Sequence, residues 1–201
     1  MKSRFAALVG VAALVLAPAA AEPWSSGPPD ERTGAPGEAT CRAFGCHESF
    51  PLNSGGGSVT ITGIPPAFAQ GAAYDLIVRL RKTGQERWGF QLRTRTASGA
   101  QGGTLEVTNA TQTQISVTNG ISYLKHKLDG TFLGQADSAS WAFRWIAPNF
   151  GTGAVTFYVA GNASDRSGGP EGDYIYTAAL ASNDPTPVES RTWGRVKSLF
   201  R

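Results

Sequence analysis

The stretch Ser140-Trp141-Ala142-Phe143-Arg144-Trp145-Ile146 decides the fold, because its large apolar side chains fall at every second position. Successive side chains of a β-strand point to opposite faces, so Trp141, Phe143 and Trp145 share one face. A helix would need apolar residues at spacings of three and four instead. We therefore predict a half-buried strand here, with an aromatic face turned toward a core.

The same period-2 pattern recurs on both sides of this stretch, in segments separated by turn residues such as Ser98-Gly99 and Asn119-Gly120. The segments are marked by Val59 and Ile61; Tyr74 to Leu80; Trp88 to Leu92; Leu105 and Val107; Ile115 and Val117; Val155 to Val159; and Tyr174 and Tyr176. About eight short strands joined by turns are typical of a two-sheet sandwich. The 25 glycines and 12 prolines in 201 residues favour the same class. We expect an all-β fold, an antiparallel β-sandwich of immunoglobulin-like type.

The first residues have the order of a secretory signal peptide. Lys2 and Arg4 precede an apolar run from Phe5 to Ala17, and small residues lead to Ala21. The run is shorter than the roughly 20 residues that a membrane-spanning helix needs. Residues 1–21 are therefore predicted to be cleaved, and the mature chain to be periplasmic, extracellular or at the cell surface, without a transmembrane segment. Removing these two positive charges from the formal net charge of +3 leaves +1, so charge indicates no nucleic-acid partner.

Three further segments follow the signal peptide. Residues 22–40 are rich in Pro, Gly and Ser and form an irregular lead-in, which we expect to become ordered only if something pins it. The residues that follow could supply this pin. Residues 41–182 make up the sandwich domain. Residues 183–201 form a tail in which Trp193, Val196 and Phe200 have the spacing of a short amphipathic helix, with a frayed terminus as the alternative.

The motif with the clearest chemistry is Cys41-Arg42-Ala43-Phe44-Gly45-Cys46-His47, a C-x4-C-H run. Covalent attachment of haem c needs two thiols for the vinyl groups and an adjacent imidazole for the iron, which is the logic of C-x-x-C-H. Two cysteines in an oxidising compartment also commonly form a disulfide. Cys41, Cys46, His47 and a second histidine have the ligand types of a zinc site, although the adjacent Cys46 and His47 would hardly share one tetrahedral ion. All three readings stay open on these residues.

A second axial ligand would have to be His126. The one methionine is Met1, inside the predicted signal peptide, and the chain has only two histidines. Alternation along residues 121–127 puts Tyr123 and Lys125 on one strand face and His126 on the other. Ligation by His47 and His126 would give a six-coordinate iron, suited to electron transfer. The alternative is a strand-end histidine without a partner.

Other classes of function have less support in the sequence. No serine or cysteine nucleophile lies in a recognisable elbow and histidines are scarce, so we expect no enzyme. Asp165, Glu171 and Asp173 offer oxygen ligands that would suit calcium, but without the spacing of a calcium loop. Calcium remains a further candidate cofactor.

Several segments resemble the bacterial choice-of-anchor V domain, a relative of the Reeler domain. They include Thr33 to Cys41, Gly45-Cys46-His47, Arg87 to Leu92, Ser140 to Pro148, Gly161-Asn162-Ala163 and Gly172 to Thr177, within roughly residues 33–180. The resemblance implies a Reeler-like β-sandwich on a secreted or cell-surface protein. It also implies the Cys-x4-Cys-His run together with a histidine near the middle of the domain, which corresponds to His126.

The resemblance favours haem over the disulfide. We therefore predict an exported monohaem c-type protein that passes electrons to an unidentified redox partner. Cys41 and Cys46 would carry the thioether bonds, His47 would be the proximal ligand and His126 the distal one. The alternative is a secreted or cell-surface adhesion or structural module with a Cys41-Cys46 disulfide, no cofactor and an unidentified surface ligand.

Overall fold

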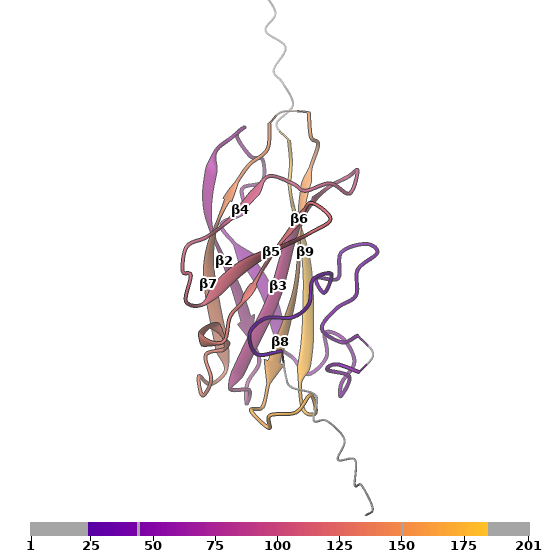
Figure 1. Cartoon of the computed structure of the whole chain (residues 1–201), viewed down its shortest axis with the longest axis vertical. Coiled ribbons are helices and arrows are strands. Elements are labelled where there is room, and N and C mark those ends of the chain that lie inside the picture. Colours follow the sequence, from indigo (N-terminus) through magenta and orange to yellow (C-terminus); the bar gives the residue numbers. More distant parts are fainter. Residues whose placement is uncertain (1–23, 44, 150, 185–201) are drawn as a thin grey trace, which may run out of the picture.

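The computed structural model describes residues 24–43, 45–149 and 151–184, which form nine strands and one short 3-10 helix. The strands are β1 (Ser58–Thr62), β2 (Ala73–Arg81), β3 (Arg87–Thr96), β4 (Thr104–Val107), β5 (Thr113–Thr118), β6 (Ile121–His126), β7 (Ser138–Ile146), β8 (Val155–Ser164) and β9 (Tyr174–Ser182), with helix η1 (Asp129–Thr131) before β7. The strands run along the long axis of the molecule in two layers (Figure 1).

Two antiparallel sheets make up the sandwich. One has the strand order β1-β2-β7-β4 and the other the order β5-β6-β3-β8-β9. All strand pairs within both sheets are antiparallel. The predicted all-β antiparallel sandwich is confirmed.

The stretch that decides the fold is β7, which lies inside the four-stranded sheet between β2 and β4. Trp141, Phe143 and Trp145 are fully buried between the sheets, as their alternation predicts. Each indole N–H finds a carbonyl: Trp141 Nε1 donates to Gly130 O and Trp145 Nε1 to Gly102 O, both at 2.8 Å. The aromatic face is thus packed without leaving a buried donor unpaired.

The β5–β6 hairpin fixes the place of His126. Its turn is Asn119-Gly120, with φ of 51° and 76°, and both residues adopt the left-handed region that two-residue hairpin turns require. The register that follows pairs Thr118 with Ile121 next to the turn and Thr113 with His126 at the far end. His126 therefore stands where β6 ends.

From Trp24 onward, the lead-in crosses the outer face of the five-stranded sheet (Figure 1, indigo). Two partly or fully buried ion pairs hold it there. Lys125 Nζ lies 2.9 Å from Asp30 Oδ1, and Arg93 Nη1 lies 2.5 Å from Glu38 Oε1. Cys41 and Cys46 are not bonded to each other in this structure, and these ion pairs hold the lead-in without them. The reason is that β3 and β6 present charged side chains to this face.

The two ends of the chain carry predictions that lie outside the described residues. These are the signal peptide, residues 1–21, and the tail helix around Trp193 to Phe200. Within the described ranges, no helix has the length and apolar character to cross a membrane.

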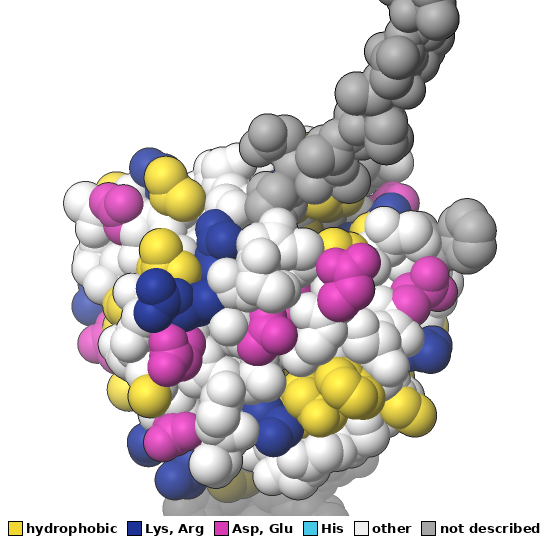
Figure 2. Space-filling model, turned by 90° about the horizontal axis from the view of Figure 1, so that it is seen from below, with side chains coloured by type: hydrophobic (Ala, Val, Ile, Leu, Met, Phe, Trp, Pro, Cys, Tyr) yellow, Lys and Arg dark blue, Asp and Glu magenta, His cyan; other side chains and the backbone are white. Residues whose placement is uncertain are grey.

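Seen from below, the end of the sandwich carries basic and acidic side chains interspersed with apolar ones (Figure 2).

Candidate functional site

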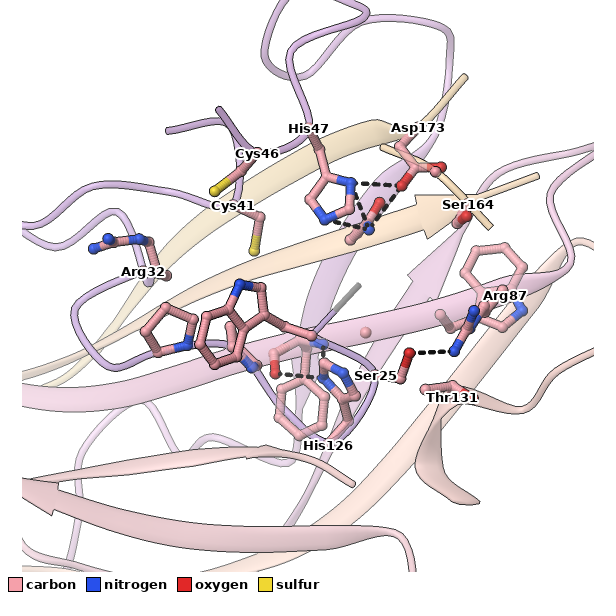
Figure 3. A pocket seen from close by; sticks show the side chains of 18 of the residues that line it. Ser25, Arg32, Cys41, Cys46, His47, Arg87, His126, Thr131, Ser164 and Asp173 are labelled. Carbon is pink, nitrogen blue, oxygen red and sulfur yellow. Dashed lines mark hydrogen bonds and ion pairs between the residues drawn. The ribbon is translucent and has the colours of Figure 1, made fainter. Parts of the chain in front are cut away.

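The four residues singled out from the sequence line one pocket. It lies between the outer face of the five-stranded sheet and the lead-in, and it is lined by Cys41, Cys46, His47 and His126 together with residues of β3, β8 and the β8–β9 loop. The histidines come from opposite sides of this space (Figure 3). His47 and His126, which are 79 positions apart in the sequence, thus line the same pocket.

The cysteine motif folds back on itself in a series of tight turns. Cys46 N donates to Ala43 O at 2.9 Å, and His47 N donates to Cys41 O at 3.2 Å. Cys41 is buried beside Ala160 and Ile175, on the outward faces of β8 and β9. Burial, reinforced by the neighbouring Cys46, raises the pKa of the Cys41 thiol to about 12. Cys41 is therefore a neutral thiol at physiological pH.

His47 is paired with a buried carboxylate. Its Nδ1 lies 2.6 Å from Oδ2 of Asp173, and Asp173 is only 1% exposed. Asn162 Nδ2 donates to the same carboxylate oxygen at 3.1 Å and lies 3.2 to 3.3 Å from the two ring nitrogens. In Figure 3 the Nδ1 edge of the ring faces Asp173. The ring is thus oriented from β8 and from the residue preceding β9.

His126 is held by the backbone of β3. The β3–β6 ladder pairs Gln91 with Lys125 and Leu92 with Leu124, and it ends there. Beyond it, Phe90 N–H donates to His126 Nδ1 at 3.0 Å, while Phe90 O lies 3.2 Å from the same nitrogen. Because a backbone N–H can only donate, the neutral ring carries its hydrogen on Nε2. The ring also forms a hydrogen bond with the backbone of Trp24.

The environment of His126 disfavours its charged form. The side chain is 7% exposed. Burial lowers its pKa to about 4; the backbone hydrogen bonds with Phe90 and Trp24 oppose this effect, and the charges of Arg87 and Lys125 add to it. His126 is therefore a neutral imidazole near pH 7, which is the form that binds a metal.

Gly89 is a pocket residue that the sequence analysis missed. A Cβ at this position would lie 2.7 Å from Cε1 of His126, so the imidazole packs directly on the β3 backbone. The signal was available, because a glycine inside the strand pattern Trp88-Gly89-Phe90 often marks a close approach. Only the three-dimensional contact identifies His126 as the group that approaches.

Two arginines of the pocket were also missed. Arg32, from the lead-in, lines the pocket and has a buried Nε without a hydrogen-bond partner. Arg87, at the start of β3, donates through Nη2 to Ser25 Oγ at 2.5 Å. Trp24, Trp88 and Phe90 add aromatic surface. Cations and aromatic rings on a surface pocket are too common in sequence to be singled out before the fold is known.

The alternative metal sites find less support in the geometry. Among the described residues, no three His, Cys, Asp or Glu side chains are placed to hold one metal ion, so a tetrahedral zinc ion would require the pocket to rearrange. Of the acids considered for calcium, Asp173 faces His47, and Asp165 Oδ1 accepts from Ser167 N–H at 2.8 Å within its own turn.

No family model matches this chain, and no curated protein matches it. Among solved structures it is similar to the human F-spondin reeler domain (fragment 1), with 17% identity over 67% of this chain and 96% of that one and a TM-score of 0.45. It is also similar to the Reelin-N domain of F-spondin, at 17% identity, 69% and 95% coverage and a TM-score of 0.45. A cohesin module from a Clostridium perfringens ATCC13124 family 33 glycoside hydrolase gives 11% identity, 64% and 96% coverage and 0.46.

The class of this protein, an antiparallel β-sandwich, rests on its own strands and their order. Its resemblance to the choice-of-anchor V domain stays a prediction.

Proposed function

We propose that this chain is an exported c-type haem protein that carries electrons. The observation that supports the proposal most is the convergence of Cys41, Cys46, His47 and His126 on one pocket. The first three are neighbours in sequence, but His126 belongs to a different sheet segment and was chosen only because a second axial ligand was needed. A chance gathering of these four side chains would not be expected from the fold class alone.

The donor set fits the group. Cys41 and Cys46 would form the thioether bonds, and His47, directly after the second thiol, would ligate the iron through Nε2 while Nδ1 faces Asp173. Histidines that bind metals commonly donate their other N–H to a carboxylate or a backbone carbonyl. His126 carries its ring hydrogen on Nε2 in the haem-free protein, so ligation through Nε2 would require this hydrogen to move to Nδ1, where Phe90 O, 3.2 Å away, would accept it.

The remaining lining residues suit the periphery of a porphyrin. Trp24, Trp88 and Phe90 offer apolar surface, and Arg32 and Arg87 offer cations for the propionate groups. When bound, the haem supplies one-electron transfer between ferric and ferrous iron. Cys41, Cys46, His47 and His126 would hold the haem, and Asp173 would orient the ring of His47.

The lead-in would have to yield for the haem to enter. The cavity measures about 80 Å³, whereas small-molecule pockets span roughly 300–1,000 Å³. The backbone of Trp24 forms a hydrogen bond with the His126 imidazole, and Trp24 is 63% exposed. Displacing Trp24 would remove this hydrogen bond, while the ion pairs of Asp30 and Glu38 hold the rest of the lead-in.

The test is to export the full chain from a host with cytochrome c maturation machinery able to process C-x4-C-H sites. An absorption spectrum and an intact mass are then recorded. We expect a Soret band, sharp α and β bands on reduction and the added mass of one haem. His126→Ala should keep the covalent haem but lose the bis-histidine spectrum. A colourless protein from that host would overturn the proposal.

A second candidate is an adhesion or structural module with a Cys41-Cys46 disulfide and no cofactor. The observation that favours it is the small cavity, together with the hydrogen bonds that the His126 ring already forms with the backbones of Phe90 and Trp24. This protein would be colourless and would weigh two hydrogens less than its reduced form. Reduction followed by alkylation of both cysteines would distinguish it from the thioether form, whose sulfurs cannot be alkylated.

A further inference from the structure

Asp173 is an unusual residue for its position. It lies just before β9 with 1% of its surface exposed, and among the described residues its ion-pair partner is His47 alone. Its Oδ2 accepts from His47 and from Asn162, but its Oδ1 is buried without a partner. The amide oxygen of Asn162 is also buried and unpaired. A buried carboxylate that lacks a full set of donors is costly to a fold.

A purely structural role does not explain this arrangement. The acidic groups that fix the lead-in, Asp30 and Glu38, are each paired with a cation and hydroxyl donors. Asp173 instead contacts an imidazole and an amide, and both of these line the pocket. An asparagine could replace its shape at this site without burying a charge. The carboxylate differs from an asparagine amide because it has no N–H, so whichever of its oxygens faces the ring can only accept the hydrogen of His47 Nδ1.

We propose that Asp173 is a positioning residue that holds His47 as the Nδ1–H tautomer, which leaves the lone pair on Nε2. In the haem-free protein this lone pair faces Asn162 Nδ2, 3.2 Å away. Asn162 supports it by donating to the same carboxylate oxygen. The inference rests on the proposed function in one respect only, the identity of the ligand of His47 Nε2, which would be the haem iron. In serine-protease triads, exchanging a buried aspartate for asparagine preserves the geometry but yields the wrong histidine tautomer, which is the effect expected here.

The structure assigns opposite tautomers to the two histidines of the chain. His47 should carry its hydrogen on Nδ1, toward Asp173, and His126 on Nε2, because its Nδ1 accepts from Phe90 N–H. Since the chain has only two histidines, nitrogen NMR of histidine-labelled protein shows both rings without overlap. His126 then serves as an internal reference in the same sample.

The first experiment uses the full mature chain without haem, near neutral pH, with His47→Gln to assign the signals. We expect the wild-type His47 signal to be that of the Nδ1–H tautomer. Asp173→Asn should move it toward the Nε2–H tautomer and leave His126 unchanged. The matched control is Asp165→Asn, in the neighbouring turn, which should move neither signal. A wild-type His47 in the Nε2–H form would overturn the inference even if the variant failed to fold.

The second experiment uses the haem-loaded protein and measures the midpoint potential. A carboxylate on the outer nitrogen makes a ligating imidazole more basic and favours ferric iron. Asp173→Asn should therefore shift the potential upward, whereas Asp165→Asn should leave it in place. An unchanged potential in Asp173→Asn would count against the positioning role. If the chain takes up no haem, the proposed function fails and the tautomer measurement alone decides the role of Asp173.

Discussion

The two outer faces of this sandwich are treated in opposite ways. On the four-stranded sheet, every second residue of β2 and β7 is exposed, including Asp75, Ile77 and Arg144. On the five-stranded sheet, the corresponding residues Gln91 and Arg93 of β3 are buried beneath the lead-in. The outer face of the four-stranded sheet, called the bare face below, contributes no residue to the pocket. The covered face buries the imidazole of His126, the thiol of Cys41 and the Glu38–Arg93 ion pair, and the candidate site lies there.

Covering a sheet with a polar segment brings charged groups out of water. Burial by itself would raise the pKa of Glu38, but hydrogen bonds from Thr33, Arg93 and Tyr123 and the charge of Arg93 outweigh it and leave that pKa below its ordinary value. The same balance lowers the pKa of Asp30, through Ser116, Thr118 and Lys125. The covered face is therefore stabilised by electrostatic complementarity, where the space between the sheets is stabilised by apolar packing.

The largest expected difference between the two faces lies in how the stability of the haem-free protein changes as pH falls. The pKa of His126 is about 4 in the folded chain, below its ordinary value of 6.5. Between these values the unfolded chain binds a proton that the folded chain does not, so stability falls as pH falls through this window and levels off below it. The full effect is about 3 kcal/mol. Chemical denaturation at a series of pH values measures it.

The matched variant is His126→Gln, whose amide oxygen can still accept from Phe90 N–H. It should flatten the loss of stability that His126 causes between pH 6.5 and 4. The loss caused by Asp30 and Glu38 should remain, because the pKa values of both lie below their ordinary values of 3.8 and 4.5 in the folded chain, and the unfolded chain takes up these protons first as pH falls. If the variant loses stability through the upper window as steeply as the wild type, the burial of a neutral His126 is wrong.

The next effect concerns the ion pair that fastens the lead-in. Glu38 and Arg93 are each 6% exposed, so Glu38→Gln would leave a buried guanidinium without its counter-charge. We expect a loss of about 2 kcal/mol in the free energy of unfolding. The double variant Glu38→Leu with Arg93→Met should lose less free energy of unfolding than the single variants Glu38→Leu and Arg93→Met lose in sum. Strictly additive losses in this cycle would show that the pair is not coupled.

The inward faces of the strands and the covered outer face differ in how far the sequence predicts them. The inward faces follow from alternation, because a strand with one apolar face has one way to bury Trp141 and Phe143. The covered outer face does not follow from it. Gln91 and Arg93 alternate with apolar residues as solvent-facing side chains do. Their spacing does not predict that Arg93 pairs with the carboxylate of Glu38, which lies 55 positions earlier in the sequence.

The candidate site shows the same division. The motif from Cys41 to His47 was visible because its chemistry is local. His126 was found by elimination among two histidines, which located the residue but not its contacts with Gly89 and Phe90. Asp173 was considered only as a calcium ligand, since its pairing with His47 depends on the long-range packing of the β8–β9 loop against the cysteine motif.

A smaller effect is expected from Gly89→Ala. The added Cβ would meet the His126 ring at 2.7 Å, and a shift of the ring or of β6 would cost about 1.5 kcal/mol. Thermal or chemical unfolding of the haem-free protein measures the change. With His126→Ala as the second variant, the extra cost of Gly89→Ala should disappear, because the atoms that clash are gone. A cost that persists in the double variant would assign it to the strand backbone instead.

The smallest effect belongs to the bare face. Asp75 Oδ1 lies 2.8 Å from Arg144 Nε, in a pair whose side chains are 73% and 45% exposed. Its geometry is as close as that of the pairs under the lead-in, yet water and salt screen it on all sides. Asp75→Asn should therefore leave the denaturation midpoint unchanged within error at physiological salt, while Glu38→Gln shifts it. Equal shifts for the two substitutions would mean that distance between charges, and not their burial under the lead-in, sets the strength of these pairs.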